Sequence, residues 1–112
     1  MIDKTKKIEV YTGCSSGDNY PINFKSQIYL IFTEIAAFRQ NGGCMYPITG
    51  DFMNKTDQEA FKMEFYCTQS DFSAVINKIK EEFRKIQPDG VEFVSIKAHD
   101  VESFSFSVKE YE

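Results

Sequence analysis

Three cysteines and one histidine are the side chains of this chain best suited to nucleophilic or metal chemistry. They are Cys14, Cys44, Cys67 and His99, separated by 30, 23 and 32 residues. A finger-like zinc site needs ligands a few residues apart, so this spacing leaves only a site assembled by the fold. An odd number of cysteines without a CxxC pair also argues against a disulfide scaffold. We predict no metal site, no cofactor and no catalytic residue.

Two of these cysteines occupy matching places in a pattern that occurs twice. In residues 8–18 and again in residues 61–71, an apolar strand pattern runs into a cysteine, a hydroxyl residue, a serine and an aspartate. A helical stripe follows each copy. If the two strands are antiparallel neighbours, Cys14 and Cys67 lie at opposite ends of one sheet. A disulfide between them is then not expected, because bridged Cα atoms lie within about 7 Å of each other.

The first copy contains the one segment that could hold an anion. Gly13, Ser15, Ser16 and Gly17 offer flexible backbone N–H groups just before a helix, whose positive end favours negative charge. The segment lacks the GxxxxGK[ST] and GxGxxG patterns, and Pro21 separates it from the helix. A solvated connection is the more ordinary interpretation, and nucleotide or anion binding is kept as an alternative.

Two amphipathic helices must position these segments. Apolar side chains recur at steps of three and four over residues 24–38, with Asn23 as the N-cap and Gly42 just past the helix end. A second stripe of the same period covers residues 72–86, with Ser70 as its cap.

Strand patterns account for most of the remaining chain. Residues 44–49 read as an edge strand, because Pro47 lacks the N–H that a ladder needs. Residues 60–68 alternate strictly between apolar and polar side chains, which is typical of a strand with one face in water.

Two further strands are predicted at the C-terminus, over residues 91–98 and 101–108. The two residues between them, His99 and Asp100, leave room only for a hairpin. A histidine at a hairpin tip is not placed to act as a general base for Cys14.

The element order β-α-β-β-α-β-β predicts a ferredoxin-like split-βαβ sandwich. Right-handed crossovers give an antiparallel sheet of order 5-4-1-3-2, counted along the chain, with both helices on one face. The 112 residues suit a single α+β domain over residues 1–112.

The net charge of −4 is concentrated near the C-terminus, where six acidic residues follow residue 87 against two lysines. This acidity disfavours nucleic acid and membranes and favours a basic protein partner. The RNA-binding pattern expected on the second central strand of this fold is also missing. Apolar runs are too short to span a bilayer and the lysine-rich N-terminus has no apolar signal core, so we expect a cytoplasmic protein.

The sheet face away from the helices is the predicted binding surface. It would present Tyr11, Glu64 and Tyr66 beside an acidic hairpin that carries Asp100, Glu102 and Glu110. Tyrosine with mixed charge is typical of protein interfaces. We expect a small acidic intracellular protein that inhibits a partner such as a nuclease by covering its basic surface. Immunity proteins to toxins and phage-borne anti-defence proteins offer the analogy.

A homodimer is the main alternative. Two such sheets packed face to face would form a dimeric α+β barrel, a small-molecule binding protein or enzyme whose cavity Tyr11 and Tyr66 would line. The last strand has no charge between Ser103 and Val108 and offers an edge for pairing as well.

Overall fold

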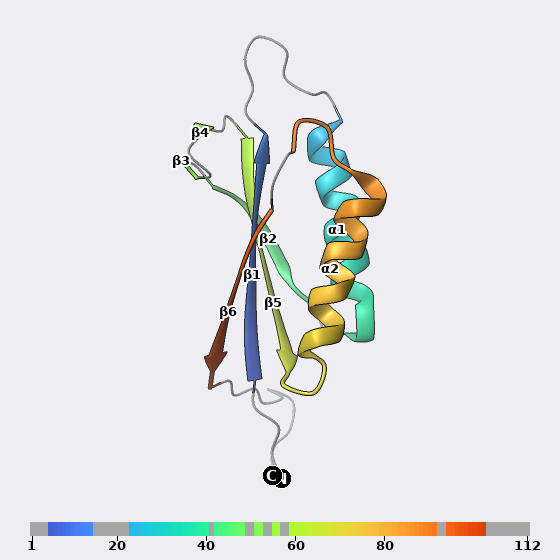
Figure 1. Cartoon of the computed structure of the whole chain (residues 1–112), viewed down its shortest axis with the longest axis vertical. Helices are drawn as coiled ribbons and strands as arrows, with labels where there is room; N and C mark the ends of the chain where they lie inside the picture. The colour runs from blue at the N-terminus through green and yellow to red at the C-terminus, as the bar shows by residue number, and fades with distance from the viewer. Residues whose placement is uncertain are drawn as a thin grey trace, which may run out of the picture.

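Four strands form one antiparallel sheet, and two α-helices lie side by side on one of its faces (Figure 1). The computed structural model describes residues 5–14, 23–40, 42–48, 51–52, 55–56, 59–91 and 94–102. The sheet contains β1 (Thr5–Cys14), β2 (Cys44–Ile48), β5 (Glu59–Thr68) and β6 (Ser95–Val101), in the order β2-β5-β1-β6. The helices are α1 (Phe24–Ala37) and α2 (Phe72–Ile86).

This order confirms the predicted ferredoxin-like α+β fold. Counted along the chain, the four sheet strands have the order 4-1-3-2, and β1 and β5 are antiparallel neighbours at its centre. β2, with its proline, lies at an edge as expected. The polar connection before β5 contains two paired strands of two residues each, β3 (Asp51–Phe52) and β4 (Lys55–Thr56), which were not predicted.

The core lies between the sheet and the helices. Alternate side chains of the two central strands point into it and are almost fully buried, as the strict alternation predicts. α1 and α2 contribute the apolar stripes of period 3.6 that cover this layer. The buried strand residues are Ile8, Val10, Thr12 and Cys14 on β1, and Phe61, Met63, Phe65 and Cys67 on β5.

The register of the central strands separates the two matching cysteines. Cys14 pairs with Glu59, whereas Cys67 pairs with Lys6 at the other end of β1. Eight residues of strand correspond to roughly 27 Å at about 3.4 Å per residue. The prediction that Cys14 and Cys67 lie at opposite ends of the sheet is therefore confirmed.

The glycine pair after α1 is needed for two different reasons. Gly42 has φ +66°, which confirms the predicted positive φ beyond the helix. A Cβ on Gly43 would lie 2.5 Å from Cδ1 of Phe65 and 2.9 Å from the carbonyl oxygen of Glu64. The close approach of the chain to β5 therefore needs glycine at position 43 as well.

The residues that directly precede the two helices differ in part from the predicted caps. Asn23 precedes α1 and Asp71 rather than Ser70 precedes α2, and neither makes a side-chain cap hydrogen bond. Asp71 instead accepts a hydrogen bond at 2.7 Å from Arg39, which follows α1, so it ties the two helices together.

The predicted hairpin at His99 and Asp100 is wrong, because both residues lie inside β6. Their partners on β1 are Lys7 and Lys6. Side chains on β1 contact both of them, and these contacts keep the strand extended where a turn was expected. β6 also begins only at Ser95, four residues later than predicted. The predicted strand over residues 101–108 lies outside the described residues after Glu102.

Within the described part of the chain, no helix is long and apolar enough to cross a membrane.

Candidate binding surface on the open sheet face

The side chains that point away from the helices form a charged and aromatic surface, which we call the open face. Directly paired residues of antiparallel strands project to the same side of a sheet, so the register identifies its members. Neither helix covers this side (Figure 1). The charged and aromatic residues of the open face, with Cys44, are Lys7, Glu9 and Tyr11 on β1, Lys62, Glu64 and Tyr66 on β5, Cys44 and Tyr46 on β2, and Lys97 and His99 on β6.

Two glutamates lie at the centre of the open face. Glu9 and Glu64 are direct cross-strand partners, an arrangement of like charges that is unfavourable by itself. The ammonium group of Lys62 lies 2.8 Å from Oε2 of Glu9 and 3.1 Å from Oε2 of Glu64. That of Lys7 lies 3.6 Å and 3.4 Å from the same two oxygens. Two cations thus bridge two anions and offset their repulsion.

Each glutamate has a further partner from an edge strand. Nε2 of His99 lies 2.9 Å from Oε1 of Glu9, and the hydroxyl group of Tyr46 donates to Oε2 of Glu64 at 2.8 Å. The side chains of Glu9 and Glu64 are only 11% and 15% exposed, although no helix covers them. The network therefore spans all four strands of the sheet and buries its own carboxylates.

Aromatic rings surround the cations of this network. The ammonium group of Lys62 lies 5.4 Å from the ring centroid of Tyr11 and 5.7 Å from that of Tyr46. Lys97 lies 5.2 Å from the centroid of Tyr11. Such cation–π contacts fix both partners in place. Tyr66, at 44% exposure, lies near this network and remains accessible.

The electrostatics of the network hold its acids charged. Hydrogen bonds from Lys62 and His99 lower the pKa of Glu9 to about 2. Hydrogen bonds from Tyr46 and Lys62 lower the pKa of Glu64, and the same two carboxylates raise the pKa of Lys62. A general acid or base needs a pKa near the working pH, so none of these three groups is suited to proton transfer at neutral pH.

Cys44 belongs to the open face but is not activated. Its Sγ lies 3.7 Å from Oε1 of Glu64. Burial and this carboxylate raise the pKa of the Cys44 thiol, which disfavours the reactive thiolate. The arrangement is therefore suited to binding rather than to nucleophilic chemistry.

The structure divides the predicted binding residues between two faces. Tyr11, Glu64 and Tyr66 lie together on the open face, as predicted. Asp100 points to the helix side, because its partner Lys6 contacts it there and also lies over the ring of Phe72 at 5.3 Å. Glu102 is exposed beyond the end of β6, and Glu110 lies outside the described residues. Asp100 therefore lies on the face opposite the three predicted residues of β1 and β5, and the position of Glu110 stays a prediction.

The candidate anion segment is only partly described. Gly13 lies half-buried near the end of β1, and Cys14 beside it is fully buried. Ser15, Ser16 and Gly17 lie outside the described residues, so anion binding there stays a prediction.

Sequence reasoning identified Glu64 but missed most of its partners at the centre of the open face. Glu9, Lys7 and Tyr46 were not singled out, and His99 was assigned to a turn. The available signal was the parity of the strands: residues 7, 9 and 11 alternate with buried residues, as do residues 62, 64 and 66. Pairing these two sets across antiparallel strands places the charges together.

Among the residues with described positions, no three His, Cys, Asp or Glu side chains lie close enough together to hold a metal ion.

Comparisons with known proteins extend the description of the fold only. No protein-family model matches the sequence, and no curated protein matches it. The crystal structure of protein SO0527 from Shewanella oneidensis is similar, with a TM-score of 0.50 and 13% identity over 90% of this chain and 95% of that one. A de novo designed protein with a ferredoxin fold, LFR1 1, gives a TM-score of 0.43 and 12% identity over 96% of each chain.

Proposed function

We propose that this is a small binding protein that acts by occupying a protein partner through its open face. The ion network of Glu9, Glu64, Lys62 and Lys7 supports this proposal most directly. It holds a group of polar side chains in a fixed arrangement without supplying an acid, base or nucleophile. A pre-organised surface loses little side-chain entropy on binding. The exposed Tyr46 and Tyr66 offer the kind of aromatic anchor that dominates protein interfaces.

The concrete version of the proposal is a cytoplasmic inhibitor, immunity-like or anti-defence-like, of an enzyme with a basic surface such as a nuclease. The net charge of −4 supports this version, because it would attract a basic partner at long range. The open face itself carries three lysines against two glutamates. We therefore assign the long-range attraction to the acids elsewhere, among them Asp100, Glu102 and Glu110, and the close contact to the tyrosines.

The contact surface can be tested with two matched tyrosine variants. A partner is first captured from the native cell with the full chain and then purified. Tyr66→Ala on the open face should weaken its binding at least about tenfold, as expected for a tyrosine anchor. Tyr29→Ala on α1, where the tyrosine is 58% exposed, should leave affinity within about twofold. Equal losses of affinity in the two variants would exclude the open face as the binding surface.

The electrostatic part has a separate test. Replacing Asp100, Glu102 and Glu110 by their amides should slow association and reduce its salt dependence. The control replaces the exposed acids Glu34, Glu81 and Asp89, which changes the net charge equally. An unchanged association rate and salt dependence in the first variant would overturn the basic-partner version and leave the open-face proposal standing.

A second candidate is a homodimer with its open faces together, in which Tyr11 and Tyr66 line a shared cavity for a small molecule. The alternating cations and anions of the open face favour it, because a twofold arrangement can bring opposite charges together. Sedimentation of the purified chain distinguishes the candidates: a stable dimer disrupted by Tyr66→Ala supports this one, and a monomer excludes it.

Anion binding near Gly13 would appear as thermal stabilisation by a panel of phosphate compounds.

A further inference from the structure

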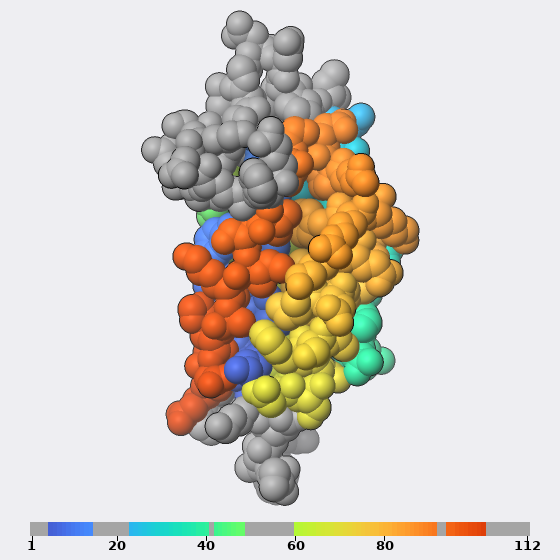
Figure 2. Space-filling view, in the orientation of Figure 1, coloured from blue at the N-terminus to red at the C-terminus, as the bar shows by residue number. Residues whose placement is uncertain are grey.

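A groove between α2 and β6 lies on the helix side of the sheet, away from the open face. Its volume is about 530 Å³, within the roughly 300–1,000 Å³ typical of small-molecule sites. Figure 2 shows α2 and β6 side by side along this part of the surface. The described residues that line it are Ile79, Lys80, Phe83, Arg84, Gln87, Pro88, Val91, Val94 and Ile96.

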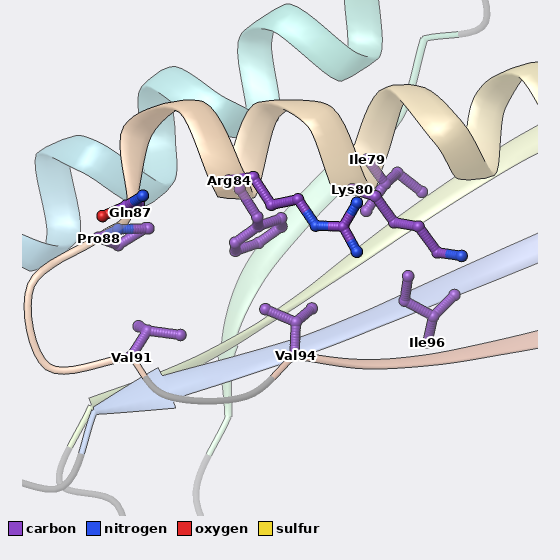
Figure 3. A pocket seen from close by; sticks show the side chains of 9 residues that line it. Ile79, Lys80, Arg84, Gln87, Pro88, Val91, Val94 and Ile96 are labelled. Atoms are coloured by element: carbon purple, nitrogen blue, oxygen red, sulfur yellow. The ribbon is translucent and has the colours of Figure 1, made fainter.

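The groove has an apolar interior. Ile79 and Phe83 of α2 form its inner wall and are almost fully buried. Val94 and Ile96 face Ile79 from the β6 side (Figure 3) and are only half-buried, although both pack against the core. The exposed apolar surface of Val94 and Ile96 favours the binding of an apolar ligand, because such a ligand would remove it from water.

Two cations mark the rim of the groove. Lys80 and Arg84 are one helical turn apart on α2, and Figure 3 shows both side chains extending from the helix toward β6. Neither makes an ion pair within the described part of the chain, whereas Lys78 on the same helix pairs with Glu82 at 3.2 Å. No acidic side chain is among the described lining residues. An anionic group at this rim would meet two cations and, among the described lining residues, no acidic side chain.

The shape of the groove favours an elongated ligand. Its lining residues on α2 run from Ile79 to Arg84, about 8 Å of helix at about 1.5 Å per residue, and Gln87 and Pro88 continue the lining beyond the helix end. We propose that the groove binds a linear alkyl carboxylate as a free monomer. The alkyl chain packs against Phe83, Val94 and Ile96, and Lys80 and Arg84 bind the carboxylate, which the planar guanidinium group can hold with two hydrogen bonds.

Calorimetry with dodecanoate below its micelle concentration tests the proposal on the full chain. Dodecanoate should bind with a stoichiometry of about one. Octanoate should bind at least about tenfold more weakly, because it buries less alkyl surface. Absence of dodecanoate binding, or equal binding of dodecyltrimethylammonium, would overturn the proposal.

Two variants locate the ligand. Replacing Lys80 and Arg84 by glutamine should weaken dodecanoate binding at least about tenfold, while replacing Lys25 and Lys85, exposed lysines outside the groove, should change it less than about twofold. Unchanged binding in the first variant would overturn the assignment.

Val94→Trp should abolish binding by filling the groove while leaving the far-ultraviolet circular dichroism unchanged. A dimer of the wild-type chain that Val94→Trp dissociates would assign the groove to a second copy of the chain and overturn the proposal. The groove and the open face share none of these residues, so either proposal can fail without the other.

Discussion

The two faces of β1 come from alternate residues of one strand, yet they bury their side chains by different means. On the helix side, Ile8 and Val10 are fully buried beneath the helices. On the open face, Glu9 between them is 8% exposed, almost as little, but its cover consists of lysine and histidine side chains. Burial on the first face depends on apolar packing, whereas burial on the second depends on charge. The two faces should therefore respond differently to truncation and to pH.

The largest difference is expected between two neighbouring aromatic residues of β5. Phe65 is fully buried and stacks on Phe32 with a centroid distance of 5.8 Å, whereas Tyr66 is 44% exposed on the open face. Phe65→Ala should lower the free energy of unfolding by about 3–5 kcal/mol, because it leaves a cavity. Tyr66→Ala should change it by less than about 1 kcal/mol. Urea unfolding measures both, and equal losses would contradict the assignment of the two faces.

Acid should weaken the open face selectively. Because the folded-state pKa of Glu9 is lowered from 4.5 to about 2, the stability that its charge provides is present above pH 4.5 and is lost as pH falls toward 2. Glu9→Gln should therefore cost about 1.5–3 kcal/mol at pH 7, the range for hydrogen bonds to a charged group, and almost nothing near pH 2. Unfolding measured across this range, with Glu34→Gln as an exposed control, tests the prediction. A penalty for Glu9→Gln that does not change with pH would contradict it.

The contribution of Lys62 to the lowered pKa of Glu9 can be measured separately. Lys62 provides the first hydrogen bond that lowers the pKa of Glu9. In Lys62→Met, that pKa should rise from about 2 toward 4.5, although His99 and Lys7 still contact the carboxylate. Carboxyl chemical shifts followed by NMR against pH measure it. Lys25→Met, which removes an exposed cation on α1 instead, is the matched control and should leave the pKa of Glu9 unchanged.

The same contrast explains which parts of the structure could be predicted from the sequence. The helix-side face could be predicted, because a period of 2 in the strands and of 3.6 in the helices indicates directly which apolar residues are buried. The topology followed from the order of these patterns and from the handedness of crossovers. The end of the sheet was mispredicted, because His99 and Asp100 look like turn residues locally. Only their pairing with Lys7 and Lys6, more than 90 residues away, makes them part of a strand.

The open face could be predicted only in part. Tyr11, Glu64 and Tyr66 were placed correctly by alternation, but a charged residue gives no signal of burial in a sequence. The partners of Glu9 come from three different strands, and only the register shows that they converge. Asp100 shows the same limit, because a shift of one residue in the strand assignment moves a side chain to the other face.

The smallest predicted effect concerns Thr12, a polar residue on the helix-side face of β1, which is otherwise buried by apolar packing. Thr12 lies on the helix side of β1 and is fully buried, and its hydroxyl group has no hydrogen-bond partner within the described structure. Burying such a group without a partner is unfavourable, and valine has nearly the same shape without the hydroxyl. Thr12→Val should therefore raise the free energy of unfolding by up to about 1 kcal/mol. Thr33 on α1 is the control, because its hydroxyl group donates to the carbonyl of Leu30 at 2.8 Å, so Thr33→Val should give no gain. If Thr12→Val instead destabilised the protein in urea unfolding, the hydroxyl group would make a stabilising contact, and the helix-side face would not be held by apolar packing alone.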